Sequence, residues 1–234
     1  TSLLDVLSSL GTEASTTDRG DLDLLGTSEL VELMNAGDHR VAEAVAERSV
    51  EIAAAVDGIT ARFRSGGRLV YIGAGTAGRI GVLDASECPP TFGTDPSMVV
   101  GLIAGGETAI RSAVENAEDD SEAAATSLCE LGLTERDTVV GISASGRTPY
   151  VVGGLEFARG RGALTVAIAS NAASDIGAVA DIAIEVITGP EFISGSTRLK
   201  SGTAQKLVVN MLTTLSMIKL GKTYRGVMVD LLAT

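Results

Sequence analysis

The chain has 234 residues, of which 45% are hydrophobic, and a formal net charge of −12. This length can bury a substantial core, and no apolar run reaches the roughly 18 residues that a transmembrane helix requires. The acidic charge argues against nucleic acid and anionic membranes as partners, because both attract a cationic face.

A small phosphorylated ligand remains compatible with an acidic chain, since backbone amides, hydroxyls and a local arginine can bind phosphate. The two cysteines, Cys88 and Cys129, are too few for a disulfide framework and lack metal-ligand spacing. No basic segment precedes the leucines near the N-terminus, so no signal peptide is expected. We therefore expect a cytoplasmic protein.

The N-terminal quarter predicts helices. Residues 1–26 show little periodicity and are expected to wrap over the surface, and a short helix should follow from Thr27 to about residue 35. A long helix is predicted from 38 to 64, where Gly66 and Gly67 end it. Its buried stripe recurs at helical spacing, namely Val41, Val45, Ile52, Val56, Ile59 and Phe63. His39, in the first turn, is expected to be solvated.

The chain is organised around residues 66–93. A short apolar strand, 68–72, runs into the glycine loop 73–78 and then into a helix. Glycines let the backbone approach a ligand, and amides at a helix N-terminus point toward negative charge, so this segment predicts an anion site. Glu87 follows in Ser-Glu-Cys-Pro-Pro, where the two prolines are expected to stop the helix and form a rigid loop.

The remaining sequence alternates apolar strands with helices. Strands are expected at 98–103, 138–142, 164–169 and 182–187, and helices at 108–117, 122–131, from Pro149, and 200–220. The last helix carries Leu207, Met211, Leu215 and Ile218 on one side. Nearly continuous apolar strands indicate an α/β fold with a parallel sheet covered on both faces, and such sheets bind ligands at the carboxyl ends of their strands.

A second strand–loop–helix unit follows the strand at 138–142. Its loop carries the hydroxyls of Ser143, Ser145 and Thr148, with Pro149 at the first helical position. Helix capping accounts for Thr148 alone, whereas three hydroxyls and a helix N-terminus together suit the oxygens of a phosphate. Both loops should converge on one ligand.

The first loop also matches the Gly-x-Gly-x-x-Gly dinucleotide fingerprint. That interpretation requires an acidic residue at the end of the second strand, but this strand ends in Ala-Gly-Gly and Glu107 comes later. A nicotinamide or flavin role is therefore disfavoured.

Two glutamates are the candidate acid and base. Glu87 lies beside the predicted phosphate loop, and Glu118 begins an acidic run that could equally be a solvated surface. Paired carboxylates can move protons at a carbon of a sugar phosphate when one pKa is raised toward neutrality. The sequence does not establish that the two meet.

Five segments, GAGTAGRIGVLDASECPPTFG, GLIAGGE, AEDD, ASGRTPYV and GSTRLKSGTAQKLVVNM, resemble the N-acetylmuramic acid 6-phosphate etherases. The resemblance extends from about Thr12 to Thr234 and implies a single SIS (sugar isomerase) domain over 1–234. Such a domain is a flavodoxin-like three-layer sandwich with a mainly parallel five-stranded sheet, here with an N-terminal helical extension. The small helical C-terminal region usual in the family is not contained in this sequence.

The resemblance also implies a reaction and a site. The D-lactyl ether of N-acetylmuramate 6-phosphate would be cleaved by elimination and hydration, without metal or organic cofactor, in cell-wall sugar recycling. Glu87 would protonate lactate and Glu118 would be the second acid/base group. The substrate-binding residues would be Gly75, Thr76, Ser143, Ser145, Gly146 and Thr148.

A homodimer is expected from the superfamily, with Ser196 and Lys200 near a partner's ligand. The family has a serine where this chain has Ala77, and usually an alanine in place of Ser143, which leaves substrate affinity open. Two rival functions remain at this point, an aldose–ketose sugar-phosphate isomerase, which would release no lactate, and a phosphosugar-binding regulator. Retention of both glutamates favours an enzyme.

Overall fold

The structure, a computed structural model, describes residues 21–230, so the expectation for residues 1–20 lies outside the described range. Its centre is a five-stranded sheet in the order β2-β1-β3-β4-β5, in which every neighbouring pair is parallel. The strands are β1 Leu69–Gly73, β2 Val99–Ile103, β3 Thr138–Ile142, β4 Leu164–Ala169 and β5 Ile182–Glu185. The predicted strands are confirmed, with bounds that agree within one or two residues.

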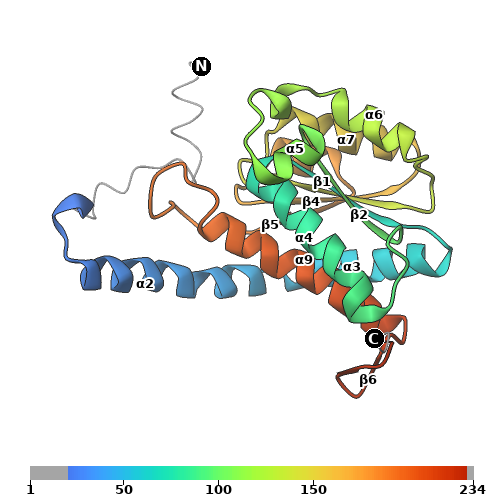
Figure 1. Cartoon of the computed structure of the whole chain (residues 1–234), viewed down its shortest axis with the longest axis horizontal. Coiled ribbons are helices and arrows are strands. Elements are labelled where there is room, and N and C mark those ends of the chain that lie inside the picture. The colour runs from blue at the N-terminus through green and yellow to red at the C-terminus, as the bar shows by residue number, and fades with distance from the viewer. Residues whose placement is uncertain (1–20, 231–234) are drawn as a thin grey trace.

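Helices cover both faces of this sheet, which confirms the three-layer α/β fold (Figure 1). One face carries α2 Thr27–Ala46, α3 Ser49–Arg64, α4 Gly75–Phe92 and α9 Lys200–Lys219. The other carries α6 Ala123–Glu130, α7 Pro149–Gly160 and α8 Asp175–Val179. Shorter elements are η2 Leu22–Leu24, α5 Gly106–Arg111, η3 Ala117–Asp119 and the hairpin of β6 Thr223–Tyr224 with β7 Val227–Met228.

The core is divided by the sheet into two apolar clusters. Successive side chains of a strand point to opposite faces, and here Leu69 and Tyr71 of β1 pack toward α3, α4 and α9, whereas Val70 and Ile72 pack toward α6 and α7. All four side chains are at most 1% exposed. This two-sided burial explains why the strand reads as a continuous apolar run.

The first helical region differs from the expectation. One helix, α2, runs through residue 37 without interruption, and the chain breaks instead at Glu47–Arg48 before α3. Gly37 is buried against α9, where an added Cβ would lie 3.8 Å from Cδ of Lys200, an ordinary van der Waals distance, and the helix continues through it. The predicted stripe is buried as expected. His39 is exposed, as predicted, but lies in the middle of α2.

The expectation that Pro89 and Pro90 stop a helix was wrong. Helix α4 continues through both to Phe92 and ends at Gly93, whose φ of 61° permits the left-handed conformation. The prolines lie in the last turn, where they remove only the donors to the carbonyls of Ala85 and Ser86 and leave the preceding ladder intact. Glu87 therefore projects from a helix and not from a loop.

The helix predicted at 108–117 is also too long. Helix α5 ends at Arg111, and Asn116 takes a left-handed conformation with a φ of 60°. This turn ends regular structure before η3, the short 3₁₀ helix that carries Glu118.

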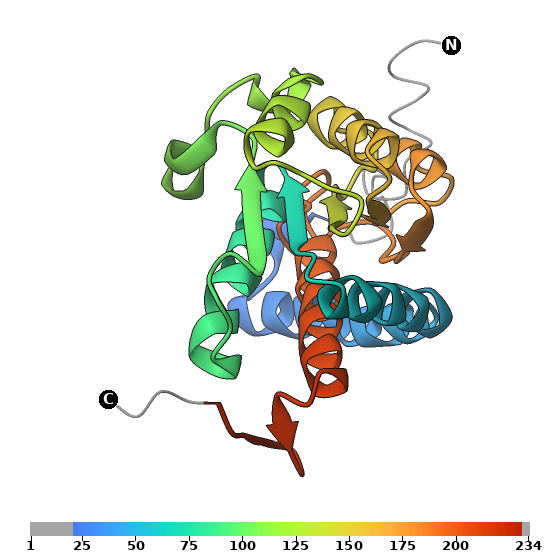
Figure 2. The same cartoon turned by 90° about the vertical axis from the view of Figure 1, so that its right-hand side faces the viewer.

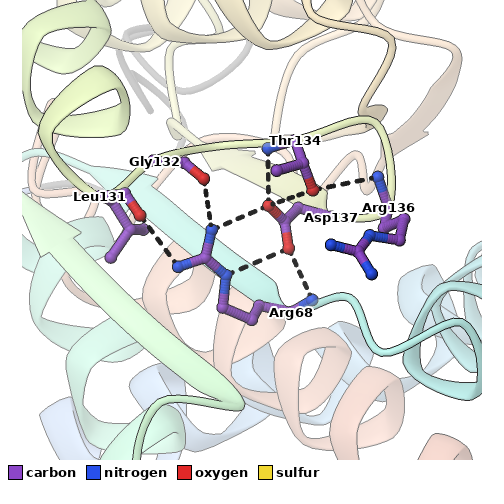
Figure 3. A network of polar contacts seen from close by, with 6 residues as sticks. All are labelled: Arg68, Leu131, Gly132, Thr134, Arg136 and Asp137. Atoms are coloured by element: carbon purple, nitrogen blue, oxygen red, sulfur yellow. Dashed lines mark hydrogen bonds and ion pairs between the residues drawn. The ribbon is translucent and has the colours of Figure 1, made fainter.

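A polar network closes the amino-terminal edge of the sheet, where β1 and β3 begin (Figure 3). The guanidinium of Arg68 donates to both carboxylate oxygens of Asp137, at 3.1 and 2.9 Å, and to the carbonyls of Leu131 and Gly132. The amides of Arg68 and Thr134 each donate to the same carboxylate at 2.8 Å. Burial alone would raise the pKa of Asp137, but the bonds from Arg68 and from the backbone outweigh it and hold the pKa below its usual range.

Candidate active site

A cavity of about 210 Å³ opens at the carboxyl ends of β1 and β3, on the edge of the sheet opposite the Arg68–Asp137 network. Both predicted loops contribute to it, which confirms that they converge. Its lining residues are Ala74, Thr76, Ala77, Glu118, Ile142, Ser143, Ala144, Ser145, Thr148, Gly195, Thr197 and Gln205.

The loop after β3 is organised by the buried hydroxyl of Ser143. Its Oγ accepts a hydrogen bond from the amide of Gly146 at 3.1 Å and shares hydrogen bonds with Oγ1 of Thr148 at 2.8 Å and Oγ of Ser145 at 3.3 Å. Thr148 stands at the N-cap of α7 as predicted, although its side chain makes no capping bond. The three hydroxyls are therefore clustered beside the N-terminus of a helix, the arrangement that an anion requires.

Gly146 is a shape-determining residue of this loop. Its φ is +75°, and an added Cβ would lie only 2.4 Å from Cβ of Ser174. Asn171 supports the loop from β4's end by donating to the carbonyl of Ala144 at 3.0 Å. Gly146 is predicted to bind substrate, yet it does not line the cavity; the structure gives it a backbone role.

The loop after β1 presents the first turn of α4 to the cavity. Thr76 and Ala77 line it, whereas Gly75 lines a neighbouring cavity of about 190 Å³. Ala74 is the N-cap and has no side chain that could satisfy the first amides of α4. These amides add helix N-terminal donors to the hydroxyls of the other loop.

The two candidate acids lie apart in one copy of the chain. Glu118, on η3, lines both cavities. Glu87 is exposed and lines neither, because it lies roughly 16 Å along α4 from Thr76 at about 1.5 Å per residue.

Helix α4, which carries Glu87, is fixed to its neighbours by Asp84. The carboxylate of Asp84 accepts hydrogen bonds from Oη of Tyr71 at 2.8 Å, Nδ2 of Asn210 at 2.7 Å and Oγ1 of Thr213 at 3.2 Å. Burial raises the pKa of Asp84, and these three bonds together with the charge of Lys206 oppose the rise. The network joins β1, α4 and α9. This buried polar contact therefore fixes the part of α4 that carries Glu87.

Three cavity residues were not predicted: Gly195, Thr197 and Gln205. Gln205 is 1% exposed, and neither of its amide atoms has a hydrogen-bond partner among the described residues. Gln205 lies among Ala204, Val208 and Val209 of α9, which are buried. A polar residue in such apolar company was the sequence feature that could have identified it.

Ser196 and Lys200 line neither of the two cavities. Lys200 is buried, and its Nζ donates to the carbonyl of Thr188 at 2.7 Å. The amides of Lys200 and Ser201 donate at 2.9 Å to the carboxylate of Glu191, which caps α9. The contacts of Lys200 within its own chain are therefore structural.

Within residues 21–230, no helix is long and apolar enough to cross a membrane. Over the same residues, no group of three or more His, Cys, Asp or Glu side chains is placed to hold a metal ion.

Two solved structures with the same fold are described as sugar-phosphate isomerases. A phosphoheptose isomerase from Francisella tularensis superposes with a TM-score of 0.62 at 19% identity, over 82% of this chain and all of that one. A putative phosphosugar isomerase from Bacteroides fragilis gives 0.63 at 22% identity, over 85% and 93%. At these identities the likeness establishes the fold.

Sequence profiles and curated relatives are more specific. The glucokinase regulatory protein N-terminal SIS domain matches residues 51–159, and the SIS domain matches 110–215. The N-acetylmuramic acid 6-phosphate etherase of Streptomyces avermitilis is 59% identical over 233 residues, which is 100% of this chain and 75% of that protein. The etherase 2 of Vibrio cholerae is 55% identical over 99% of this chain and 76% of its own length. The chain belongs to the N-acetylmuramic acid 6-phosphate etherase family.

Proposed function

We propose that the hydroxyl-lined cavity is the place where this chain performs the lyase reaction of its family. N-acetylmuramate 6-phosphate would be cleaved there to N-acetylglucosamine 6-phosphate and D-lactate. The observation that carries the proposal is the convergence of both anion-binding loops and Glu118 on one cavity. We also propose that residues 1–234 form a single SIS domain with an N-terminal helical extension.

The phosphate would bind to the loop after β3. Ser143, Ser145 and Thr148 supply hydroxyls, and the first amides of α7 lie beside them. Thr76 and the first turn of α4 face the same space from the other loop. Donors of this kind compensate a phosphate charge in a chain whose net charge is negative.

The elimination needs two proton transfers. Opening of the sugar ring gives an aldehyde, which acidifies the C2–H bond beside it. A carboxylate removes the C2 proton, the C3–O bond breaks, and the electron pair of that bond leaves with lactate as a second group donates a proton. Water then adds across the C2–C3 double bond, with hydroxyl on C3 and a proton on C2. Glu118 would act at the cavity, and Glu87 would protonate the leaving lactate.

The separation of the two glutamates in one copy supports a second copy as the source of one of them. Glu87 projects from α4 into solvent, one turn beyond the exposed Leu83. Leu83 and Glu87 share one face of the helix, because their spacing is four residues. A homodimer in which α4 of one protomer reaches the cavity of the other would unite Glu87 and Glu118.

An apolar strip on α9 is the surface that such a dimer would cover. Met211, Leu215 and Ile218 share one face, as predicted, and all three are more than a third exposed. Helix α9 packs against α4, and Figure 2 shows that the two run down the same side of the sheet. Burial of this strip together with Leu83 would place Glu87 at the two-fold interface.

The reaction is tested by incubating the protein with N-acetylmuramate 6-phosphate and measuring D-lactate and N-acetylglucosamine 6-phosphate. Equal amounts of the two products are expected. An aldose–ketose isomerase would consume the sugar phosphate without releasing lactate, and a regulator would bind it unchanged; either result would refute the proposal.

The shared site is tested by pairing Glu87→Gln with Glu118→Gln in one dimer, purified through two different affinity tags. Each homodimer should be nearly inactive. If the glutamates meet across the interface, the mixed dimer contains one intact site and should recover about half of wild-type turnover. Recovery of no activity in a stable mixed dimer would place both glutamates in the same protomer, and a monomer by light scattering at micromolar concentration would exclude the arrangement.

A further inference from the structure

Gln205 is a polar side chain whose burial the protein alone does not explain. It is 1% exposed, yet neither Oε1 nor Nε2 has a hydrogen-bond partner in residues 21–230. Buried polar atoms are normally paired, and an unpaired one costs a large part of its hydration free energy. Gln205 differs from the other orphaned buried groups in lying on the wall of the proposed active site.

The helix that carries Gln205 is anchored one turn before this residue. Glu191 accepts from the amides of Lys200 and Ser201 and so anchors the first turn of α9. Gly202 brings that turn close to α4, since an added Cβ would lie 3.4 Å from Cγ2 of Thr76. The helix therefore presents Gln205 to the cavity from a well-anchored turn, with the hydroxyl loop of Ser143 lining the same space.

We propose that Gln205 recognises the sugar portion of the substrate and not its phosphate. A primary amide has an acceptor in Oε1 and two donors on Nε2. A phosphate dianion offers acceptors only, so it would leave Oε1 unpaired and facing negative charge. Hydroxyl and N-acetyl groups of an amino sugar both donate and accept, and they satisfy both ends of the amide.

This inference rests on the proposal that the cavity binds a sugar phosphate. It divides the site into two parts: the hydroxyl loop binds the phosphate, and Gln205 binds the carbon chain that carries the reacting atoms. The alternative is that Gln205 merely fills space between α9 and α4.

The experiment compares two probes, N-acetylglucosamine 6-phosphate and inorganic phosphate, by calorimetry on the wild type and on Gln205→Leu. Loss of two neutral hydrogen bonds should weaken the sugar phosphate about 5- to 100-fold and leave inorganic phosphate unchanged. Ser145→Ala should weaken both probes.

Thermal unfolding without ligand provides a second readout. Because the amide is unpaired in the free protein, Gln205→Leu should unfold at the same temperature as the wild type or higher. Gln205→Met, which keeps the length and flexibility of the side chain, replaces Gln205→Leu if the branched side chain does not fit. Thr138→Val is the matched control, because Oγ1 of Thr138 is equally buried and unpartnered but lies at the amino end of β3; it should change neither probe.

Equal weakening of both probes, or unchanged sugar-phosphate binding at any stability, would overturn the assignment. The test of Gln205 can be separated from the test of the proposed reaction. A wild type that binds N-acetylglucosamine 6-phosphate but releases no lactate would refute the reaction and leave Gln205 in its role. A wild type that binds no sugar phosphate would refute both.

Discussion

Buried polar side chains lie at both edges of the sheet, but their hydrogen-bonding partners differ. At the amino edge, Arg68 and Asp137 are held by each other and by four backbone groups (Figure 3). At the carboxyl edge, Gln205 has no hydrogen-bond partner among residues 21–230, and Glu118 lines an open cavity. Polar groups at the first edge stabilise the fold, whereas those at the second are, by our proposal, the groups that a ligand would pair.

This difference in pairing between the two edges has an energetic reason. A buried charge must be paired and hydrogen-bonded to be tolerated, and the amino edge meets this condition. A binding site can meet it only when the ligand is present, so some stability of the free protein is given up there. Substitutions at the amino edge should therefore change mainly stability, whereas those at the carboxyl edge should change mainly turnover or binding.

The largest effect is expected from the two candidate acids, Glu118 at the carboxyl edge and Glu87 on α4. Glu87→Gln and Glu118→Gln should each lower kcat by at least ~10²-fold, because a positioned acid or base contributes about 10²–10⁴ in rate. Neither should change the unfolding temperature. Lactate release is the measurement, and near-wild-type release by one variant would remove that residue from the mechanism.

At the amino edge the effect should fall on stability alone. Arg68→Met leaves the carboxylate of Asp137, which is 2% exposed, without its cationic partner. We expect a loss of about 2–4 kcal/mol in the free energy of unfolding, with unchanged KM in the folded enzyme. Urea denaturation measures it. Arg136→Met is the control, since that exposed side chain makes no bond in the network, and a surface change of this kind costs at most about 0.5 kcal/mol.

Ser143 lines the cavity and also holds its own loop together, so its replacement should affect both binding and stability. Loss of a hydrogen bond to a charged ligand costs about 1.5–3 kcal/mol, so Ser143→Ala should raise KM roughly 10- to 150-fold with little change in kcat. Its Oγ also accepts from the amide of Gly146, so a loss of about 1 kcal/mol in stability should accompany this.

Ala77→Ser is the complementary variant. Ala77 lines the same cavity as Ser143, which is compatible with one donor having moved from the first loop to the second. When Ala77→Ser is combined with Ser143→Ala, KM should return most of the way to the wild-type value, but the lost stability should not be recovered. Unchanged KM in Ser143→Ala would assign this serine to the loop structure alone.

The smallest effect is a pH dependence confined to the amino edge. The pKa of Asp137 is lowered in the folded protein, so its ionised form contributes stability that is present above the unfolded pKa of about 3.9. That contribution is lost as the pH falls below this value and through the folded pKa. The stability difference between wild type and Asp137→Asn should therefore be constant near neutrality and shrink below about pH 4, as chemical denaturation across pH can measure. A difference that does not shrink as the pH falls below about 4 would contradict this.

Local sequence patterns predicted the sheet and the convergence of its loops well. Apolar runs identified all five strands, and hydroxyls after β3 identified the lining of the cavity. The continuation of α4 through Pro89 was missed, because the cost of a proline depends on how many helical residues follow it. The boundary between the first two helices was predicted near residues 35–38 and lies instead at Glu47–Arg48, inside what was predicted as one continuous helix.

The site was harder to predict than the fold. Spacing cannot tell that Glu87 points away from the cavity that Glu118 lines, since that depends on the path of α4. Gln205 was missed because a lone glutamine in a helix resembles a solvated residue until its burial is known. Lys200 is predicted to lie near a partner's ligand, and within its own chain it donates to a backbone carbonyl.

The exclusively parallel sheet also determines how the chain acquires its structure. No strand of this five-stranded sheet pairs with its neighbour through a hairpin, and the Arg68–Asp137 contact closes a segment of 69 residues. The entropy of closing such loops is lost before the contacts form, which places this topology among the slower folders. If the central pair β1–β3 belongs to the folding nucleus, Arg68→Met should slow refolding, whereas Gln205→Leu should leave the refolding rate unchanged. The edge opposite the cavity would then govern how quickly the folded protein forms.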